Sequence, residues 1–202
     1  MQDAQQNTVK LTTCLLLGLV SIIGDKLVSY NNNNHFLKAV IDNATHGIVA
    51  GLSWTLIVLL QNEPIAKNLP SILFCIFLSS LIDVDHFVEA KSFNIKDATN
   101  LDRRPFFHCT TLPIIIWTVL LIASKLASEN LYNLNYCAWI LLTSFLSHHI
   151  RDATRRGLWI PPFGSTGKIP YYFYVLLTML FPYFVYLSME KHQKIIPSVH
   201  NV

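Results

Sequence analysis

The chain has 202 residues, of which 52% are hydrophobic and only 13% are charged, and its mean hydropathy is +0.40. Soluble domains carry about 25% charged residues, so a soluble protein of this length could not cover its surface with so few charges. The net charge of +3, without a basic run interleaved with aromatic residues, excludes a nucleic-acid partner from our expectations. The composition predicts an integral, multi-pass membrane protein whose partner is the lipid bilayer.

Apolar stretches along the chain predict about six transmembrane helices in one domain. We expect a polar tail over 1–10, a single transmembrane helical domain over 11–190 and a second polar tail over 191–202. The expected helices cover about 11–30, 37–60, 71–88, 103–127, 136–152 and 171–189. Each is near the ~20 residues that a helix needs to cross a bilayer.

Prolines and polar residues between these stretches indicate where the helices are expected to end. The run 11–23 could pass for the apolar part of a signal peptide, but no small-x-small cleavage site follows it, so we interpret it as the first helix. Two prolines within 61–70 predict a loop there. Pro105 suits the first turn of the fourth helix, and Pro113 predicts a kink within that helix.

Alternation of the crossings decides which helix ends share a membrane face. The ends of the first, third and fifth helices should meet the starts of the second, fourth and sixth. Histidines, aspartates and arginines gather at these ends, whereas the loops of the opposite face offer only Glu63, Lys67 and Glu129. The expected fold class is therefore an all-α, multi-pass transmembrane bundle with polar His/Asp/Arg clusters at one membrane face. Basic residues in the loops of that face predict that it is cytoplasmic.

Four of these segments pair histidine with aspartate or arginine at helical spacing. They are Asp42 and His46; Asp83, Asp85 and His86; Arg103, Arg104 and His108; and His148, His149, Arg151, Asp152, Arg155 and Arg156. A lone histidine near a helix end is usually a satisfied or interfacial side chain, and paired arginines are usual positive-inside residues. The joint pattern favours function, because ionisable residues inside a membrane are costly.

Imidazole and carboxylate groups in this pattern predict a site for a divalent metal ion, with zinc, manganese and iron left open. The candidate ligands are His46, Asp83, Asp85, His86, His108, His148, His149 and Asp152. They suffice for one open metal site or for two metals about 3.5–4 Å apart. Arg104, Arg151 and Arg156 are candidate catalytic residues, because guanidinium groups hold phosphate or carboxylate.

These residues favour metal-dependent hydrolysis of a lipid-like phosphoester at the membrane boundary. A bound metal would lower the pKa of its water toward about 7 and so supply a nucleophile. An amphiphilic substrate would place its head group at the metal and its tail in lipid.

The same motifs resemble a known family over nearly the whole chain. The segments Asp42-Asn43-Ala44-Thr45-His46-Gly47, Ile82-Asp83-Val84-Asp85-His86-Phe87, Arg103-Arg104-Pro105-Phe106-Phe107-His108-Cys109-Thr110, Ser147-His148-His149-Ile150-Arg151-Asp152, Gly157-Leu158-Trp159-Ile160 and Pro162-Phe163-Gly164 resemble the eukaryotic transmembrane protein 267 family. That family brings no established activity with it.

A more distant resemblance concerns bacterial inner-membrane proteins described as metal-dependent hydrolases of the LexA-binding type. The order T-H, D-x-D-H, H-R-G-x-x-H-S and H-x-x-x-D is similar to theirs. The resemblance implies as ligands His46, Asp83, Asp85, His86, His108, His148 and Asp152. This chain departs from the pattern at three positions, where Arg103, Pro105 and Cys109 stand in place of histidine, glycine and serine.

Two other functions stay open at this point. Six-helix zinc exporters use His/Asp pairs one turn apart on two helices, and Asp42/His46 with His148/Asp152 has that spacing. Transport sites usually lie near the bilayer midplane, so pairs about 15 Å below the headgroups would favour a divalent-metal transporter. The third possibility is a catalytically inactive membrane scaffold that keeps only the fold or the metal.

Overall fold

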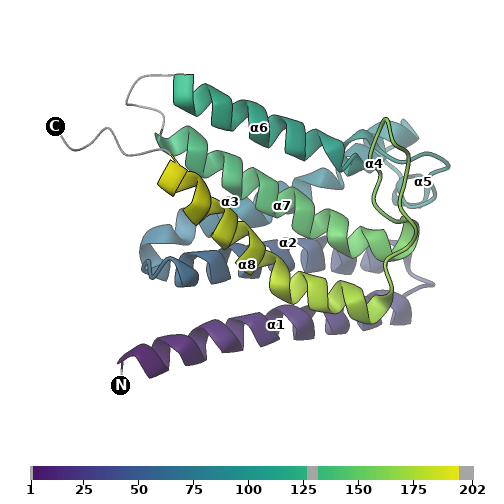
Figure 1. Ribbon diagram of the computed structural model, residues 1–202. Coiled ribbons are helices and arrows are strands. Elements are labelled where there is room, and N and C mark those ends of the chain that lie inside the picture. Colours follow the sequence, from purple (N-terminus) through teal and green to yellow (C-terminus); the bar gives the residue numbers. More distant parts are fainter. Residues whose placement is uncertain (1, 127–131, 196–202) are drawn as a thin grey trace.

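The computed structural model describes residues 2–126 and 132–195 (Figure 1), and these contain helices and no strand. The six long helices are α1 (Gln2–Tyr30), α2 (His35–Leu60), α3 (Ile65–Ile82), α6 (Thr111–Leu126), α7 (Tyr132–Arg156) and α8 (Tyr171–Ile195). Two short helices, α4 (Asp85–Ala90) and α5 (Ile95–Ala98), and a 3-10 turn, η1 (Phe106–His108), lie between α3 and α6. The predicted all-α bundle is confirmed, and four of the six predicted transmembrane helices are long and apolar enough to span a membrane.

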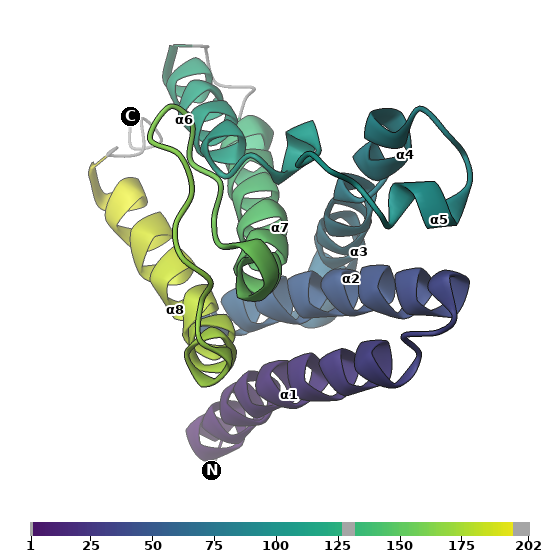
Figure 2. The ribbon, with the colours of Figure 1, turned by 90° about the vertical axis from the view of Figure 1, so that its right-hand side faces the viewer.

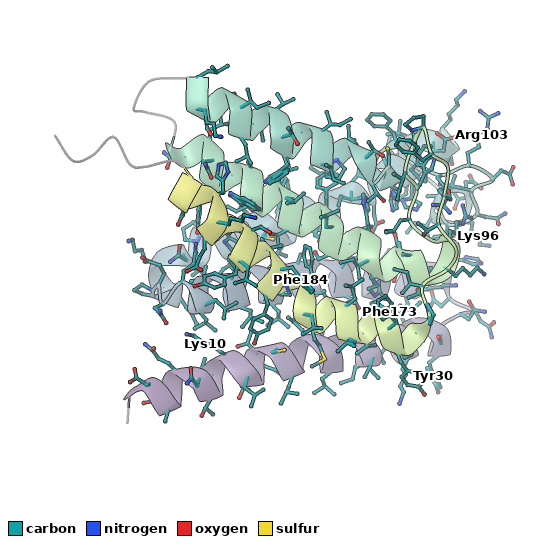
Figure 3. All side chains as sticks on the ribbon, in the orientation of Figure 1. Lys10, Tyr30, Lys96, Arg103, Phe173 and Phe184 are labelled. Atoms are coloured by element: carbon teal, nitrogen blue, oxygen red, sulfur yellow. The ribbon has the colours of Figure 1, made fainter. Side chains whose placement is uncertain are left out.

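Four stretches of the described chain are long and apolar enough to cross a membrane. They are Asp3–Tyr30, His35–Leu60, Ile65–Ala90 and Tyr171–Gln193, with α6 as a shorter apolar helix. Large apolar side chains such as Phe77, Ile115 and Phe184 point outward from these helices (Figure 3 labels Phe184) and remain exposed, as contact with lipid requires. The protein is an integral, multi-pass membrane protein, as its composition predicts.

The long helices run in alternating directions, and one end of the bundle collects the polar connections. Figure 1 shows the α1–α2 turn, the short helices α4 and α5, and the loop between α7 and α8 at the same end. Figure 2 looks onto this end and places α7 between α2, α3, α6 and α8, each of which it contacts. The predicted gathering of the helix ends is therefore confirmed.

Apolar packing fills the other half of the bundle. Trp54 and Ile57 of α2, Cys75 of α3 and Trp139 and Ile140 of α7 form its centre and are at most 3% exposed. The first two belong to the second half of α2, and the last two to the first half of α7. The polar groups of the first half of α2 and the second half of α7 consequently face each other at the opposite end.

Two predicted tails are partly helical. Helix α1 already begins at Gln2, so the described part of the predicted polar tail over 1–10 forms the first turns of this helix; the stretch contains neither glycine nor proline to break a helix. Helix α8 continues to Ile195, and the remainder of the predicted tail, 196–202, lies outside the described residues.

The prolines also act differently from the prediction. Helix α3 begins at Ile65, directly after Pro64, so the predicted loop over 61–70 is shorter and Pro70 lies inside the helix. Helix α6 begins at Thr111 rather than near 103, and Pro105 instead precedes η1. Pro113 is the third residue of α6, where its missing N–H has no intrahelical partner to lose, so it produces no kink there. The predicted end of this helix at 127 lies outside the described residues.

Candidate metal centre

Four segments that are distant in sequence bring the predicted ligands together at the polar end of the bundle. Helix α2 supplies His46, the α3–α4 junction supplies Asp83, Asp85 and His86, η1 supplies His108, and α7 supplies His148, His149 and Asp152. Close packing of α3 against α2 is needed for this meeting. A side chain at Gly47 would come within 2.8 Å of Ser80 Oγ, and one at Gly51 within 2.5 Å of Ile76. Glycine at these two positions therefore lets the helices approach.

Donor atoms in the cluster are spaced as metal ligands are. Three sets of side chains within the described ranges have donor atoms that lie within 4.8 Å of one another: His46, Asp83 and His148; Asp83, His86 and His108; and His108, His148 and Asp152. In the last set, His108 Nε2 lies 3.3 Å from His148 Nε2 and 3.2 Å from Asp152 Oδ2. His148 Nε2 and Asp152 Oδ2 lie 3.3 Å apart. Atoms about 2.0–2.1 Å from a tetrahedral zinc lie roughly 3.3 Å apart.

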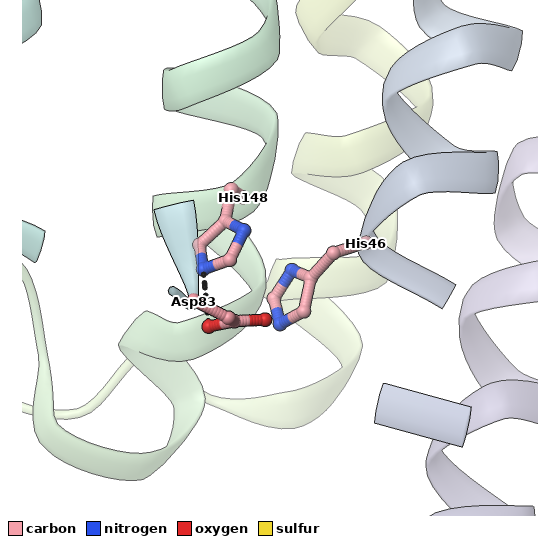
Figure 4. A group of neighbouring side chains, drawn as sticks. All are labelled: His46, Asp83 and His148. Atoms are coloured by element: carbon pink, nitrogen blue, oxygen red, sulfur yellow. Dashed lines mark ion pairs between the residues drawn. The ribbon is translucent and has the colours of Figure 1, made fainter. Parts of the chain in front are cut away.

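Asp83 connects this set to its neighbours. Its Oδ1 lies 3.4 Å from His148 Nε2, 3.5 Å from His108 Nε2 and 3.6 Å from His86 Nδ1. Figure 4 shows the carboxylate of Asp83 beside the rings of His148 and His46, with the ion pair to His148 dashed. The Nδ2 group of Asn43 donates to the other oxygen, Oδ2, at 3.2 Å, and so orients the carboxylate.

His46 extends the cluster on the α2 side. Its ring stacks on that of His148, with centroids 3.7 Å apart and planes inclined by 15°. His46 Nε2 lies 3.4 Å from Asp152 Oδ1. Both rings are buried, at 1% and 0% exposure, so their orientation is fixed by packing.

Backbone carbonyls orient two of the imidazoles. His148 donates from Nδ1 to Ser79 O at 3.0 Å, which leaves the Nε2 lone pair directed at the cluster. Metal-binding histidines are usually held in this way. His149 instead donates from Nε2 to Phe107 O at 2.9 Å and belongs to none of the three sets. The structure thus places His149 as a support for the segment that carries His108.

Several buried polar atoms of the cluster lack a hydrogen-bond partner. They are His46 Nδ1, Asp85 Oδ1, His86 Nδ1, His108 Nδ1 and His149 Nδ1. Such atoms are unfavourable, because they lose their hydrogen bonds to water without gaining others. A cation near Asp85, His86 and His108 would satisfy three of them, so the donor set fits a divalent metal ion.

Three carboxylates near the His108 side chain affect the pKa of its imidazole. Burial lowers the pKa of its imidazole, but Asp152, Asp83 and Asp85 together raise it to about 11. Without metal, the ring is therefore a cation that balances part of the acidic cluster. A metal ion bound to this ring would take over the charge by displacing the proton.

The four arginines near the cluster have different environments. Arg151 is 1% exposed and bonds to Asp25 through Nε and one terminal nitrogen, at 3.1 and 2.9 Å, and to Asp42 at 2.5 Å. This buried ion-pair network joins α7 to α1 and α2, so Arg151 does not fit the predicted role of a substrate-binding arginine. Arg155 also pairs with Asp42, at 2.6 Å, and reaches Asp152 at 3.3 Å.

Arg104 and Arg156 lie beside the cluster. Arg104 donates to the carbonyl oxygens of Gly157 and Arg156, and Arg156 donates to that of Leu101 at 3.1 Å. Both guanidinium groups keep further N–H groups, and both line the pocket over the cluster.

A pocket of about 1070 Å³ lies over the cluster. Among its walls are the candidate ligands Asp83, His86, His108 and Asp152. Basic side chains line it as well: Lys38, Lys96, Arg104, Arg155 and Arg156. Lys96 is labelled at this end of the bundle in Figure 3. The arrangement places a group of basic side chains next to the candidate metal ligands.

Sequence reasoning missed three participants. Asp25 balances Arg151, Ser79 orients His148, and Lys96 on α5 faces the pocket. The sequence could have indicated Asp25, because a carboxylate that directly follows the apolar run of the first helix is expected to pair with a cation. Ser79 acts through its backbone carbonyl, which no side-chain pattern can reveal.

Curated relatives share most of the chain. A protein of Mus musculus named Transmembrane protein 267 is 36% identical over 180 residues, which cover 88% of this chain and 81% of that protein. Its namesake in Danio rerio is 32% identical over 203 residues, which cover 97% of this chain and 89% of the relative. No protein-family model and no solved structure matches the chain. The likeness to bacterial hydrolases thus stays a prediction from the motifs.

Proposed function

This chain belongs to the transmembrane protein 267 family, and we propose that it is a metal-dependent hydrolase that acts at the membrane boundary on a lipid-like phosphoester. One observation carries the proposal. Five candidate metal ligands, His149 among them, and five basic side chains line the same pocket, at the end of a membrane-spanning bundle.

The acidic and imidazole groups supply the metal-binding half of this pocket. His108, His148 and Asp152 offer two nitrogens and an oxygen at the mutual spacing of metal ligands, with Asp83 beside them. A divalent metal there would supply Lewis acidity and a water of lowered pKa. Because His108 and Asp152 also line the pocket, the substrate and the metal would meet at the same wall.

The basic groups supply the substrate-binding half. Arg104 and Arg156 present N–H groups that are free to hold phosphate oxygens, and Lys38 and Lys96 add positive charge from α2 and α5. A phosphoester carries negative charge that increases at its oxygens in the transition state, where such groups stabilise it. Lipid-facing helices beside the pocket suit an acyl tail.

A divalent-metal transporter is the second candidate, because of the depth of His46. This residue is the twelfth of the 26 residues of α2, so it lies about 17 Å along the helix from its start. A transport path would have to continue past Trp54, Ile57 and Trp139, which pack the other half of the bundle at 3% exposure or less. The pocket and this packing together favour a site that is entered from one end.

Purified protein in lipid nanodiscs tests the proposal. After loading with zinc, manganese or iron, we expect bound metal and release of phosphate or head group from phospholipid substrates. His108→Ala should lose both, whereas His192→Ala, a change in α8 outside the three donor sets, should keep both. Wild-type protein without bound metal at neutral pH would refute both candidates. Bound metal with zinc uptake into proteoliposomes, but no hydrolysis, would favour transport.

A further inference from the structure

The donor atoms of the cluster divide into two groups on either side of His108. The first group, which we call the helix group, contains His108 Nε2, His148 Nε2 and Asp152 Oδ2. The second, the junction group, contains Asp85 Oδ1 and His86 Nδ1 from the α3–α4 junction.

The helix group is a complete ligand triad. Its three distances are 3.2, 3.3 and 3.3 Å. Two imidazoles and one carboxylate on one face leave the remaining positions of a metal open to water or substrate. The hydrogen bond from His148 Nδ1 to Ser79 O fixes the ring for this task.

The junction group has its own need for a cation. Asp85 Oδ1 lies 3.4 Å from His86 Nδ1 and 3.4 Å from His108 Nδ1, and none of the three atoms has a hydrogen-bond partner. Asp85 is 6% exposed, so water does not replace the missing partners. Its other oxygen, Oδ2, accepts a hydrogen bond from the Phe107 backbone N–H at 2.5 Å, which directs Oδ1 toward the two rings.

A single ion cannot serve both groups. The lone pairs of Nδ1 and Nε2 point out of opposite sides of one imidazole ring. An ion bound to His108 Nε2 in the helix group therefore lies on the far side of the ring from Asp85 Oδ1. With only the helix group filled, the Nδ1–H of His108 would face Asp85 Oδ1 at 3.4 Å, whereas His86 Nδ1 would keep neither a ligand nor a hydrogen bond.

Asp83 lies between the two groups. Its Oδ1 is 3.4 Å from His148 Nε2 and 3.5 Å from His108 Nε2 in the helix group, and 3.6 Å from His86 Nδ1 in the junction group. A carboxylate in this position can bind one metal with each oxygen, or both with one.

We propose that the site holds two divalent metal ions, one in the helix group and one in the junction group, bridged by the carboxylate of Asp83. The inference deepens the proposed function and rests on it only in assuming that the cluster binds metal. Two-metal sites with ions about 3.5–4 Å apart serve phosphoester hydrolysis by holding the attacking and the leaving oxygen. The substrate class of the proposed function agrees with this arrangement.

The number of metal ions per chain can be measured directly. Protein in nanodiscs is saturated with Zn²⁺, freed of excess metal by gel filtration and analysed for zinc per chain. We expect two zinc ions in the wild type and in His192→Ala, and one in His86→Ala, which removes a junction ligand only. One zinc ion in the wild type, or two in His86→Ala, would overturn the proposal.

Electron paramagnetic resonance of the Mn²⁺-loaded protein gives a second test of the number of bound ions, independent of activity. Two bridged ions should give a spin-coupled spectrum in the wild type, and His86→Ala should give that of an isolated ion. If His86→Ala does not fold, Asp85→Asn removes the charge of the same group with little change in volume. An isolated-ion spectrum from the saturated wild type would contradict the proposal without any variant.

These outcomes separate the metal count from the hydrolase function. One zinc ion with phospholipid hydrolysis would leave the proposed function standing and refute the pair of metals. Two zinc ions without hydrolysis would support the pair and refute the proposed function.

Discussion

Replacement of Arg151 by alanine should destabilise the protein, because this side chain holds three helices together. Its guanidinium bonds to Asp25 of α1 and Asp42 of α2 from the interior of α7. Removing one partner of a buried ion pair costs about 3–5 kcal/mol. The side chains of Asp25 and Asp42 are 22% and 20% exposed and can regain some hydration, so we expect the lower value, about 3 kcal/mol. For a chain of this length, that loss lowers Tm by about 6–12 °C.

Arg156→Ala is the matched control, since it removes the same side chain one helical turn and a half further along α7. Arg156 is exposed and donates only to the carbonyl oxygen of Leu101. Its loss should change the free energy of unfolding by about 0.5 kcal/mol or less. The assay is thermal unfolding of metal-free protein in detergent, followed by tryptophan fluorescence. Equal Tm shifts for Arg151→Ala and Arg156→Ala would refute the structural role of the buried network.

Three further predictions concern the site and its supporting loop. Because the carboxylates around His108 raise its pKa to about 11, metal must displace a proton at neutral pH. Apparent zinc affinity, measured by competition with an indicator dye, should therefore rise by up to about tenfold per pH unit for each proton released, and a pH-independent affinity would contradict this. Removal of metal by a chelator should lower Tm reversibly, by the equivalent of about 2.7 kcal/mol at a zinc concentration of 100 Kd; an unchanged Tm would argue against a filled site. Gly157→Ala should lower Tm more than Gly164→Ala. Both glycines have positive φ, but only at Gly157 would the new Cβ meet another atom, Thr166 O, at 2.1 Å. Equal Tm shifts for the two variants would contradict this clash.

The bundle was largely predictable because membrane helices carry their signal locally. Runs of about twenty apolar residues mark the crossings, and the four spans of the structure contain four of the six predicted helices, those at 11–30, 37–60, 71–88 and 171–189. The helix ends were harder to predict. The sequence predicts a loop around Pro70 and a kink at Pro113, yet each proline lies in the first two turns of its helix, where few or no backbone hydrogen bonds are lost.

The predicted ligands mostly meet, but the roles of individual residues required the packing. His148 and Asp152 share a face by helical spacing alone, and their side chains lie 3.3 Å apart. The adjacent His149 and Arg151 point elsewhere, because successive residues on a helix are about 100° apart. His149 therefore supports Phe107, and Arg151 bonds to Asp25 and Asp42.

The sequence by itself determined that this is a membrane protein with histidines and aspartates at one end of its helices. Hydropathy and chain alternation suffice for that, since a helix in lipid must satisfy its own backbone and must cross from one face to the other. Only the tertiary structure decided which donor atoms converge, that Asp83 lies between two groups of them, and which arginines face the pocket. Those features depend on rotation and depth of packed helices, and on a loop carrying His108 that is held by backbone contacts rather than by a residue pattern.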